Sequence, residues 1–457
     1  MLQTLKNAWR TKDIRGKILF TLLILLLYRI GTVIPVPFVA DSNLATSGSI
    51  LGFMNMLAGG SLEQMTLFAL GVTPYINASI IIQLLAVVFP KLAELSKDEQ
   101  GKRKMNTITR ILTVALALVT AIGYFFLLKR NNLLVTRVAN SDKLWLYAMV
   151  IIACYCAGAA LIMWLGEQIN QKGIGNGISL ILFANIVGVI PKQLVYFYNF
   201  IVAAFNVADN GVVRGIFAIV MMLALVAIVI ALTVFVIWVT GSERRIPVQY
   251  AKQLKGRKMY GGQSSFLPIK LNMVGVMPVI FASSIVTVIP TILMLCGIDG
   301  TKATFWDRVY NFLGSDGWFY PVILLVLIVA FTYFYTEISF NPREIANNLK
   351  KNGGTVAGIR QGRPTSEYIQ KILGKVTLVG AIFLSIVAIL PIIAGPHLMQ
   401  PLIQLILGGE TAAADAAYLT SIFTFGGTSL LIVVGVVLET FRELEAQLTM
   451  RSQRKLF

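Results

Sequence analysis

Residues 47–90, SGSILGFMNMLAGGSLEQMTLFALGVTPYINASIIIQLLAVVFP, decide the fold of this chain. The first apolar piece, Ile50–Ala58, is too short to cross a bilayer, which takes about 20 apolar residues, and a Gly-Gly pair ends it. No charge follows Glu63 until Lys91, but Pro74 interrupts this apolar run. Irregular backbone at membrane depth is tolerated only where protein or a watery cavity surrounds it. The stretch therefore predicts either a pore with a segment seated in it or a re-entrant packing element without a gating role.

A second copy of part of this stretch occurs later in the chain. GVTPYINASII at residues 71–81 recurs as GVMPVIFASSI at residues 275–285, with seven of eleven positions identical. A weaker echo pairs GISLIL at residues 177–182 with GTSLLI at residues 427–432. Matching spans interrupted by Gly and Pro in two halves indicate a central site at the interface between repeats. Chance similarity between apolar segments is the alternative.

Composition indicates a polytopic membrane protein. Of the 457 residues, 56% are hydrophobic and 13% are charged, whereas soluble proteins carry about 25% charged residues. The charged N-terminus has no small-residue cleavage site before the first span, so we expect no cleaved signal. Cys154, Cys156 and Cys296 lie in apolar spans and are expected to be buried core residues, not a disulfide framework or a metal site. His397 is expected in an outer surface loop.

Hydropathy predicts ten spans, and the charges between them predict the orientation. With the N-terminus inside, 30 Lys and Arg residues fall on the inner side and 8 on the outer side, and Arg29 completes the 39. This asymmetry places both termini in the cytoplasm. Arg29 lies late in the first span and is expected to snorkel to the outer interface. The spans are predicted near Ile18–Ile34, Met65–Phe89, Ile108–Leu128, Leu144–Leu165, Gly177–Ala204 (interrupted by Pro191 and Lys192), Ile216–Val239, Leu271–Cys296, Trp318–Ile338, Val376–Ala394 and Tyr418–Leu438.

The orientation makes the repeat an inverted one. Span two runs inward and span seven outward, and spans five and ten are opposed in the same way. The predicted fold is therefore an all-α polytopic membrane protein with ten transmembrane helices in two inverted pseudo-symmetric halves and a re-entrant segment. The N-terminal half is residues 1–205, with the re-entrant segment at about 49–65. The C-terminal half is residues 206–457, with long basic inner loops at 241–270 and 338–375.

The two long inner loops form a candidate docking surface. Positive-inside topology and contact with anionic lipid explain some of their charge. Topology alone needs only a few charges, so the length of the loops favours a platform for a cytosolic partner. The candidate contact residues are Arg244, Arg245, Arg257, Lys258, Arg343 and Arg360.

Catalytic chemistry is not expected. No catalytic constellation or metal-binding motif stands out, so we predict neither an enzyme nor a cofactor. The glycine-rich run at Gly173–Gly177 lacks a following Lys-Ser/Thr and is interpreted as a tight turn opening the fifth span. The span centres lack Asp, Glu, Lys and His, which ion-coupled transporters commonly place there. The polar residues Asn77, Gln83 and Asn185 fit interhelical hydrogen bonds.

Aliphatic residues remain at the span centres, in part as pairs at i,i+4 spacing on one helix face. Core packing is the usual fate of such residues, but an aliphatic constriction can also gate a pore by dewetting. The residues are Val72, Ile76, Ile178 and Leu182, with Ile280 and Ile432 as the repeat mates of Ile76 and Leu182.

Several segments resemble the SecY family, the channel subunits of bacterial protein translocases. The resemblance covers essentially the whole chain. Its most specific segments are Phe68–Leu85, Gly166–Leu180, Arg244–Ala251, Leu267–Ser284, Asn341–Lys351 with Gly358–Arg360, and Phe425–Val433.

The resemblance implies two clamshell halves around an hourglass pore. It also implies a lateral gate, with spans two and three on one side and spans seven and eight on the other. It implies that the six aliphatic residues named above form a pore ring. It implies that Arg360 binds the driving partner. It also implies a plug helix on the outer side, around Ser49–Met65, with the residues Ile50, Leu51, Phe53, Met54, Met56 and Leu57.

The implied function is the passage of unfolded polypeptides across the bacterial plasma membrane and the lateral release of transmembrane segments into lipid. The motor ATPase SecA or a translating ribosome would supply energy. The other expected partners are small subunits similar to SecE and SecG, signal peptides, unfolded preproteins and anionic lipids. One alternative is a small-molecule secondary transporter, which predicts a charge at mid-membrane. Another is a pore-less membrane-assembly factor, which needs neither ring nor plug.

Overall fold

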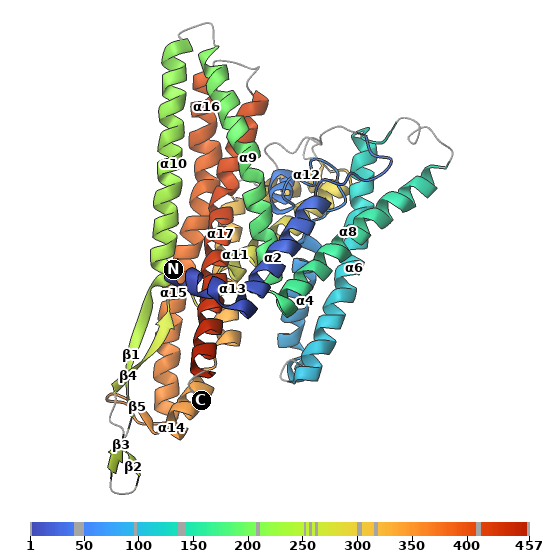
Figure 1. Cartoon of the computed structure of the whole chain (residues 1–457). Coiled ribbons are helices and arrows are strands. Elements are labelled where there is room, and N and C mark those ends of the chain that lie inside the picture. The colour runs from blue at the N-terminus through green and yellow to red at the C-terminus, as the bar shows by residue number, and fades with distance from the viewer. Residues whose placement is uncertain are drawn as a thin grey trace.

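Long helices that run side by side build most of the molecule (Figure 1). The computed structural model describes residues 2–454 except 41–49, 96–97, 136–142, 207–210, 251–252, 256–257, 261–263, 299–303, 315–318 and 408–412. Each predicted span coincides with one helix. These helices are α2 (Lys12–Gly31), α4 (Thr73–Val88), α6 (Glu99–Arg130), α8 (Leu144–Lys172), α9 (Gly177–Phe205), α10 (Gly211–Gly241), α11 (Met277–Leu295), α13 (Phe319–Ser339), α15 (Arg363–Ala394) and α17 (Ala413–Arg454).

Hydropathy and length make this a multi-pass membrane protein. Among the described residues, seven helical segments, which begin in α6, α8, α9, α10, α11, α13 and α15, are long and apolar enough to cross a membrane. Helix α4 is apolar but has only 16 residues, because its predicted span includes a non-helical entry. The shorter helices are α1 (Leu2–Arg10), α3 (Ile50–Leu57), α5 (Pro90–Leu95), α12 (Phe305–Leu313) and α14 (Pro342–Lys351).

The two copies of the repeated sequence begin their helices in the same way. Gly71 and Gly275 both have positive φ, +57° and +70°, a conformation that costs glycine little. The next residue caps the helix in each copy, with φ and ψ of −89° and −8° at Val72 and −96° and −3° at Val276. A proline follows in the first turn of both helices, where its missing N–H costs nothing. The repeat in sequence is therefore also a repeat in local structure.

The glycine-rich run Gly173–Gly177 is the tight turn that was predicted between α8 and α9. Asn176 caps α9, and its Oδ1 accepts a hydrogen bond from the Ile178 backbone N–H at 3.1 Å. The Gly175 backbone N–H donates to Glu443 Oε2 of α17 at 2.9 Å. The turn therefore ties the start of α9 to the C-terminal helix.

The two long basic loops form one folded body of short strands at the end of the helical bundle, which the sequence analysis did not predict. Strand β1 (Glu243–Tyr250) lies between β4 (Ser264–Lys270) and β5 (Gly354–Val356), and both pairings are antiparallel. Ile246 and Val248 alternate inward on β1, as a half-buried strand requires. The strands and α14 lie at the lower end of the bundle in Figure 1.

This sheet has its own apolar core, made with the start of α15. Its fully buried members are Ile246, Val248, Ile269, Val356 and Leu373. A separate hairpin of β2 (Gln253–Lys255) and β3 (Lys258–Tyr260) forms the lowest tip in Figure 1. Because β5 comes from the second loop and β1 and β4 from the first, the two basic loops are held together.

Three helices pack against one another at the end of the molecule away from the strands. Helix α9 continues through Pro191, so the expected interruption of the fifth span does not occur. Helix α15 continues through a π-helical turn, η1 (Gly395–Met399), into α16 (Gln400–Leu407). His397 therefore lies in a helical turn and not in a loop. The shared buried residues are Phe200, Ala204, Ala218, Met222, Ile403 and Ile406.

The cysteine prediction is partly wrong. Cys154 and Cys156 on α8 are only half-buried, and Cys296, which caps α11, is exposed. Cys296 follows the last apolar turn, so its side chain reaches the surface at the helix end. Among the described residues, no group of three His, Cys, Asp or Glu side chains could hold a metal ion.

Candidate pore constriction and plug

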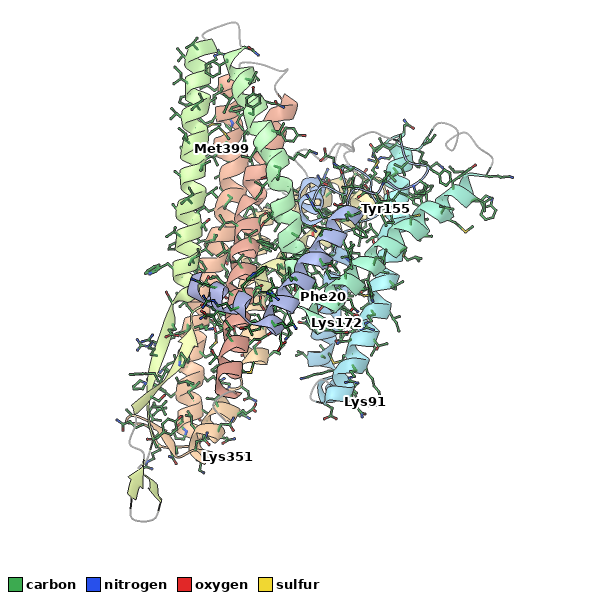
Figure 2. The ribbon with its side chains drawn as sticks, viewed as in Figure 1. Phe20, Lys91, Tyr155, Lys172, Lys351 and Met399 are labelled. Atoms are coloured by element: carbon green, nitrogen blue, oxygen red, sulfur yellow. The ribbon has the colours of Figure 1, made fainter. Side chains whose placement is uncertain are left out.

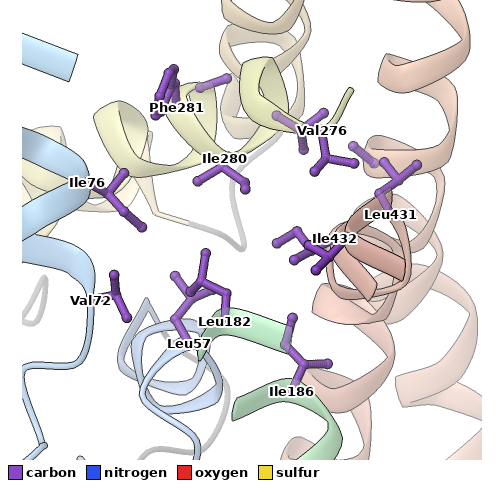
Figure 3. Packing of buried hydrophobic residues seen from close by; sticks show 14 of the residues in the cluster. Leu57, Val72, Ile76, Leu182, Ile186, Val276, Ile280, Phe281, Leu431 and Ile432 are labelled. Carbon is purple, nitrogen blue, oxygen red and sulfur yellow. The ribbon is translucent and has the colours of Figure 1, made fainter. Parts of the chain in front are cut away.

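Six predicted aliphatic residues lie in one buried cluster at the centre of the molecule. Their exposed fractions run only from 1% to 8%. Figure 3 shows Val72 and Ile76 on one side, Ile280 above, Ile432 opposite and Leu182 below. The sixth residue, Ile178, belongs to the same cluster. We call these six residues the collar: Val72, Ile76, Ile178, Leu182, Ile280 and Ile432.

Helix starts bring most of the collar together. Val72 is the N-cap residue of α4, and Ile76 lies one turn further along. Ile178 lies in the first turn of α9, and Ile280 lies in the first turn of α11. Leu182 follows in the second turn of α9, and Ile432 comes from the interior of a long helix, α17. The caps of three helices therefore determine where the collar forms.

A short helix with its following turns, residues 50–70, is seated against the collar; we call it the plug segment. Its helix is α3, and the buried side chains of Met56 and Leu57 belong to the same cluster as the collar. Figure 3 shows Leu57 beside Leu182. Ser429 Oγ of α17 lies 3.2 Å from Met56 Sδ. The plug segment thus packs against the collar from one side.

The other predicted plug residues are placed less completely. Met54 is half-buried, with its sulfur 3.5 Å from Thr291 Oγ1 of α11. Ile50, Leu51 and Phe53 belong to α3, but their side chains lie outside the described part of the structure. The predicted boundary at residue 49 also lies outside it.

Arg29 contradicts its predicted role at the membrane surface. Its guanidinium does not reach for the outer interface but turns inward, where Nη2 donates to the Gly188 carbonyl at 2.7 Å. Nη1 donates to the Gly59 carbonyl of the plug segment at 3.4 Å. One carbonyl of the Gly-Gly turn and one carbonyl of α9 accept hydrogen bonds from the guanidinium inside the protein, so the side chain has no need to snorkel.

Polar residues in the spans make bonds between elements, as predicted for two of the three. Tyr335 Oη of α13 donates to Gln83 Oε1 of α4 at 2.7 Å. Asn185 of α9 donates to the Leu57 carbonyl of α3 at 2.6 Å. The first bond joins a helix of the N-terminal half to one of the C-terminal half. It lies at the seam where the resemblance implies a lateral gate.

The sheet and the elements beside it present four of the six predicted partner-binding residues on their surface. Arg244, Arg245, Arg343 and Arg360 are exposed. Arg245 Nε pairs with Glu243 Oε1 at 2.7 Å. Arg257 lies outside the described residues, as does the side chain of Lys258.

Arg360 is held in a tight turn next to β5. Gly358 and Gly362 on either side have φ of +79° and +94°. Thr365 Oγ1 donates to the Arg360 carbonyl at 2.7 Å, which fixes the backbone while the side chain stays exposed. No described residue forms an ion pair with Arg360. The turn therefore presents a guanidinium that is available to a partner.

Positively charged side chains lie close together at the end of β4. Burial lowers the pKa of Lys270 at the end of β4, and the neighbouring charge of Arg442 lowers it further, while Glu243 opposes the shift. Arg442 Nη2 also donates to the Thr240 carbonyl at the end of α10 at 3.1 Å. The sheet, α10 and α17 therefore share a positively charged junction.

Known proteins resemble this chain in sequence and in fold. The family model for SecY matches residues 66–441. The protein translocase subunit SecY of Halalkalibacterium halodurans is 41% identical over 460 residues, covering 99% of each chain. The solved structure of a protein-conducting channel has a TM-score of 0.63 at 18% identity, covering 94% of this chain and 92% of that one. Sec61 in a canine ribosome-channel complex has a TM-score of 0.60 at 18% identity, covering 94% and 92%.

Proposed function

This chain belongs to the SecY family and is the protein-conducting channel subunit of a Sec translocase, and from that premise we propose that it passes unfolded polypeptides outward and releases apolar segments sideways into lipid. The observation that carries this proposal is the collar of six buried aliphatic residues with Leu57 against it. An aliphatic constriction excludes water and ions when closed. It offers no fixed polar contacts, so it can yield to chains of any sequence. The protein is a channel and not an enzyme.

We further propose ten spans in two inverted halves, residues 1–205 and 206–457, with both termini in the cytoplasm of a bacterium. The matching starts of α4 and α11 support the inverted repeat. Figure 2 shows Lys91 and Lys351 toward the lower end of the molecule, Lys172 nearer its middle, and Met399 toward the upper end. Inner loops of membrane proteins are rich in Lys and Arg, which supports the lower end as cytoplasmic.

Impermeant thiol reagents should distinguish the two faces. In a chain with Cys154 and Cys156 replaced by Ala, the exposed native Cys296 should react from the outside only. Gln100→Cys and Asn352→Cys, at exposed positions on the opposite face, should react only after the membrane is opened. Reaction of either introduced thiol in intact cells would contradict the topology and, with it, the inverted repeat.

The proposed partners follow from two surfaces. The exposed arginines of the sheet support docking of a SecA-like motor or a ribosome, and the basic junction below the spans supports contact with anionic lipids. The Gln83–Tyr335 bond supports a seam that opens to admit signal peptides and release transmembrane segments. Subunits similar to SecE and SecG complete the proposed assembly, as the family membership suggests.

Reconstitution tests the proposed function directly. The translocase is placed in vesicles with a SecA-type motor, ATP and an unfolded preprotein, and protease-protected product is measured. We expect protected product that depends on both the motor and ATP. Saturable uptake of a small solute without protected polypeptide would instead support a secondary transporter.

A further inference from the structure

One face of α9 contacts the plug segment at three successive positions. Asn185, Gly188 and Lys192 are spaced by three and four residues, so they lie on the same side of the helix. Asn185 and Lys192 bond to the plug segment directly, and the Gly188 carbonyl is joined to it through Arg29. Helix α9 also carries Ile178 and Leu182 of the collar, so one helix supports both the constriction and the segment that fills it.

The first contact holds the end of α3. Asn185 is fully buried, and its Nδ2 donates to the Leu57 carbonyl at 2.6 Å. Leu57 is the last residue of α3, so this bond satisfies a carbonyl that has no partner within the helix. The bond also fixes Leu57 at the position where its side chain lies beside Leu182 (Figure 3).

The second contact passes through Arg29 of α2. The planar guanidinium donates to the Gly188 carbonyl at 2.7 Å and to the Gly59 carbonyl at 3.4 Å. Donors in a fixed fork can hold two acceptors on different elements at once. Arg29 therefore joins the turn after α3 to the middle of α9.

The third contact is an ion pair at the outer end of this face. Lys192 Nζ lies 2.7 Å from Glu63 Oε2, with 34% of the lysine side chain exposed but only 9% of the glutamate. Asn55 Nδ2 donates to the same carboxylate oxygen at 3.1 Å, and the Glu63 backbone N–H donates to Asn55 Oδ1 at 3.0 Å. A carboxylate this deeply buried depends on such partners. Displacing the plug segment would separate Glu63 from Lys192.

We propose that Asn185, Lys192, Arg29 and Glu63 form a polar clasp that holds the plug segment in its closed seat and limits ion leak through the resting channel. The apolar collar alone does not fix the orientation of the plug segment, because aliphatic contacts are non-directional. The polar contacts of the clasp fix the plug segment relative to α9, and this keeps Leu57 over the collar. Lys192 is partly exposed, so water can solvate it when a passing chain displaces the plug. The proposal rests on the proposed channel function and names the residues that set its closed state.

The ion conductance of the purified translocase in planar bilayers, without motor or substrate, tests the clasp. Lys192→Gln and Glu63→Gln should each raise resting conductance about tenfold, because a hydrogen bond to a charged group contributes about that factor. The double variant should leak no more than either single one, since both remove the same contact. The charge swap Glu63→Lys with Lys192→Glu should recover part of the closure. Lys129→Gln, at an exposed position at the end of α6, is the matched control and should leave the conductance unchanged.

Deleting residues 52–57 distinguishes an effect of Lys192→Gln on the clasp from a general effect of the same substitution on α9. In that background Lys192→Gln should add nothing, because Leu57, which the clasp keeps over the collar, is gone even though Glu63 remains. Asn185→Ala gives an independent arm that alters no charge and should also raise the leak. Unchanged conductance in the single variants, additive effects in the double variant, or an equal increase from Lys192→Gln without the plug would overturn the proposal. Protected preprotein is scored separately, so a loss of transport with the conductance pattern intact would count against the channel function and not the clasp.

Discussion

Ile432→Asn should make the resting channel leak ions while the protein still reaches the membrane in normal amounts. Ile432 is 2% exposed and closes the collar opposite Ile76 (Figure 3). Burying such a side chain contributes about 1.5–3 kcal/mol, so its loss should shift the closed-to-open equilibrium about 10- to 100-fold. An amide there also wets the constriction. Conductance of the reconstituted translocase without substrate measures the effect.

Ile392→Asn is the matched control for this experiment. Ile392 of α15 is also 2% exposed and lies in the same cluster, but it is not a collar residue. Its replacement should cost about 1–3 kcal/mol of stability for a buried amide without a partner, and should lower abundance without opening a pore. If Ile432→Asn behaves in the same way, unstable and without conductance, then Ile432 is a core residue and not part of a gate.

Arg360→Glu should remove most motor-driven translocation and leave membrane abundance and the resting pore unchanged. The exposed guanidinium in its fixed turn can form a bidentate pair with a carboxylate, and reversal of its charge repels the same partner. Central interface residues of this kind contribute about 2 kcal/mol or more, so binding should weaken about 30-fold or more. The reconstituted assay with saturating ATP measures protected preprotein for the variant and the parent chain.

Two further variants sharpen this test. Arg360→Lys should restore only part of the activity, because an ammonium cannot reproduce the paired geometry. Lys350→Glu, on the exposed face of α14, should have a milder effect that salt suppresses, as for a charge at the rim of an interface. Full activity of Arg360→Glu at physiological salt would remove this residue from the docking surface and leave Arg244, Arg245 and Arg343 as its described candidates.

Local signals in the sequence predicted the helices and their starts. Glycine and proline act on the backbone of their immediate neighbours, so Gly71 and Gly275 could be recognised as matching entries to α4 and α11 from the residues alone. The turn at Gly173–Gly177 was readable for the same reason. Span limits were less accurate at the inner side, because α15 begins at Arg363 and α17 ends at Arg454, both well beyond the apolar runs that set the predicted limits at Val376 and Leu438.

Features that depend on distant pairs were missed. Strand β1 pairs with β5, about a hundred residues later, so no local period in the basic loops indicates a sheet. Glu63 and Lys192 are 129 positions apart, and the local sequence around each shows only a single charge beside an apolar span. The only available signal was that each is an isolated charge flanking a long uncharged run. The plug segment is consequently held by more polar contacts than its single charge indicated.

The collar was predicted residue by residue, yet its function remains a proposal because burial does not distinguish a gate from a core. All six side chains are as buried as the helix-packing residues around them. A closed gate and a packed core use the same apolar contacts and differ only in whether they separate under load. The conductance experiments on Ile432 and Ile392 are designed to supply this difference.

The helix starts at the collar have an electrostatic consequence. Helices α4, α9 and α11 all begin there, so three helix N-termini lie around an otherwise apolar ring. Asn176 caps α9, whereas no side chain caps α4 or α11. Aligned peptide dipoles place the equivalent of about half a positive charge at the N-terminus of each helix. Among the described collar residues no side chain carries a charge to offset this field. Once the ring is wetted, an anion therefore meets a lower barrier than a cation of the same size, and the protein imposes this preference with its backbone alone.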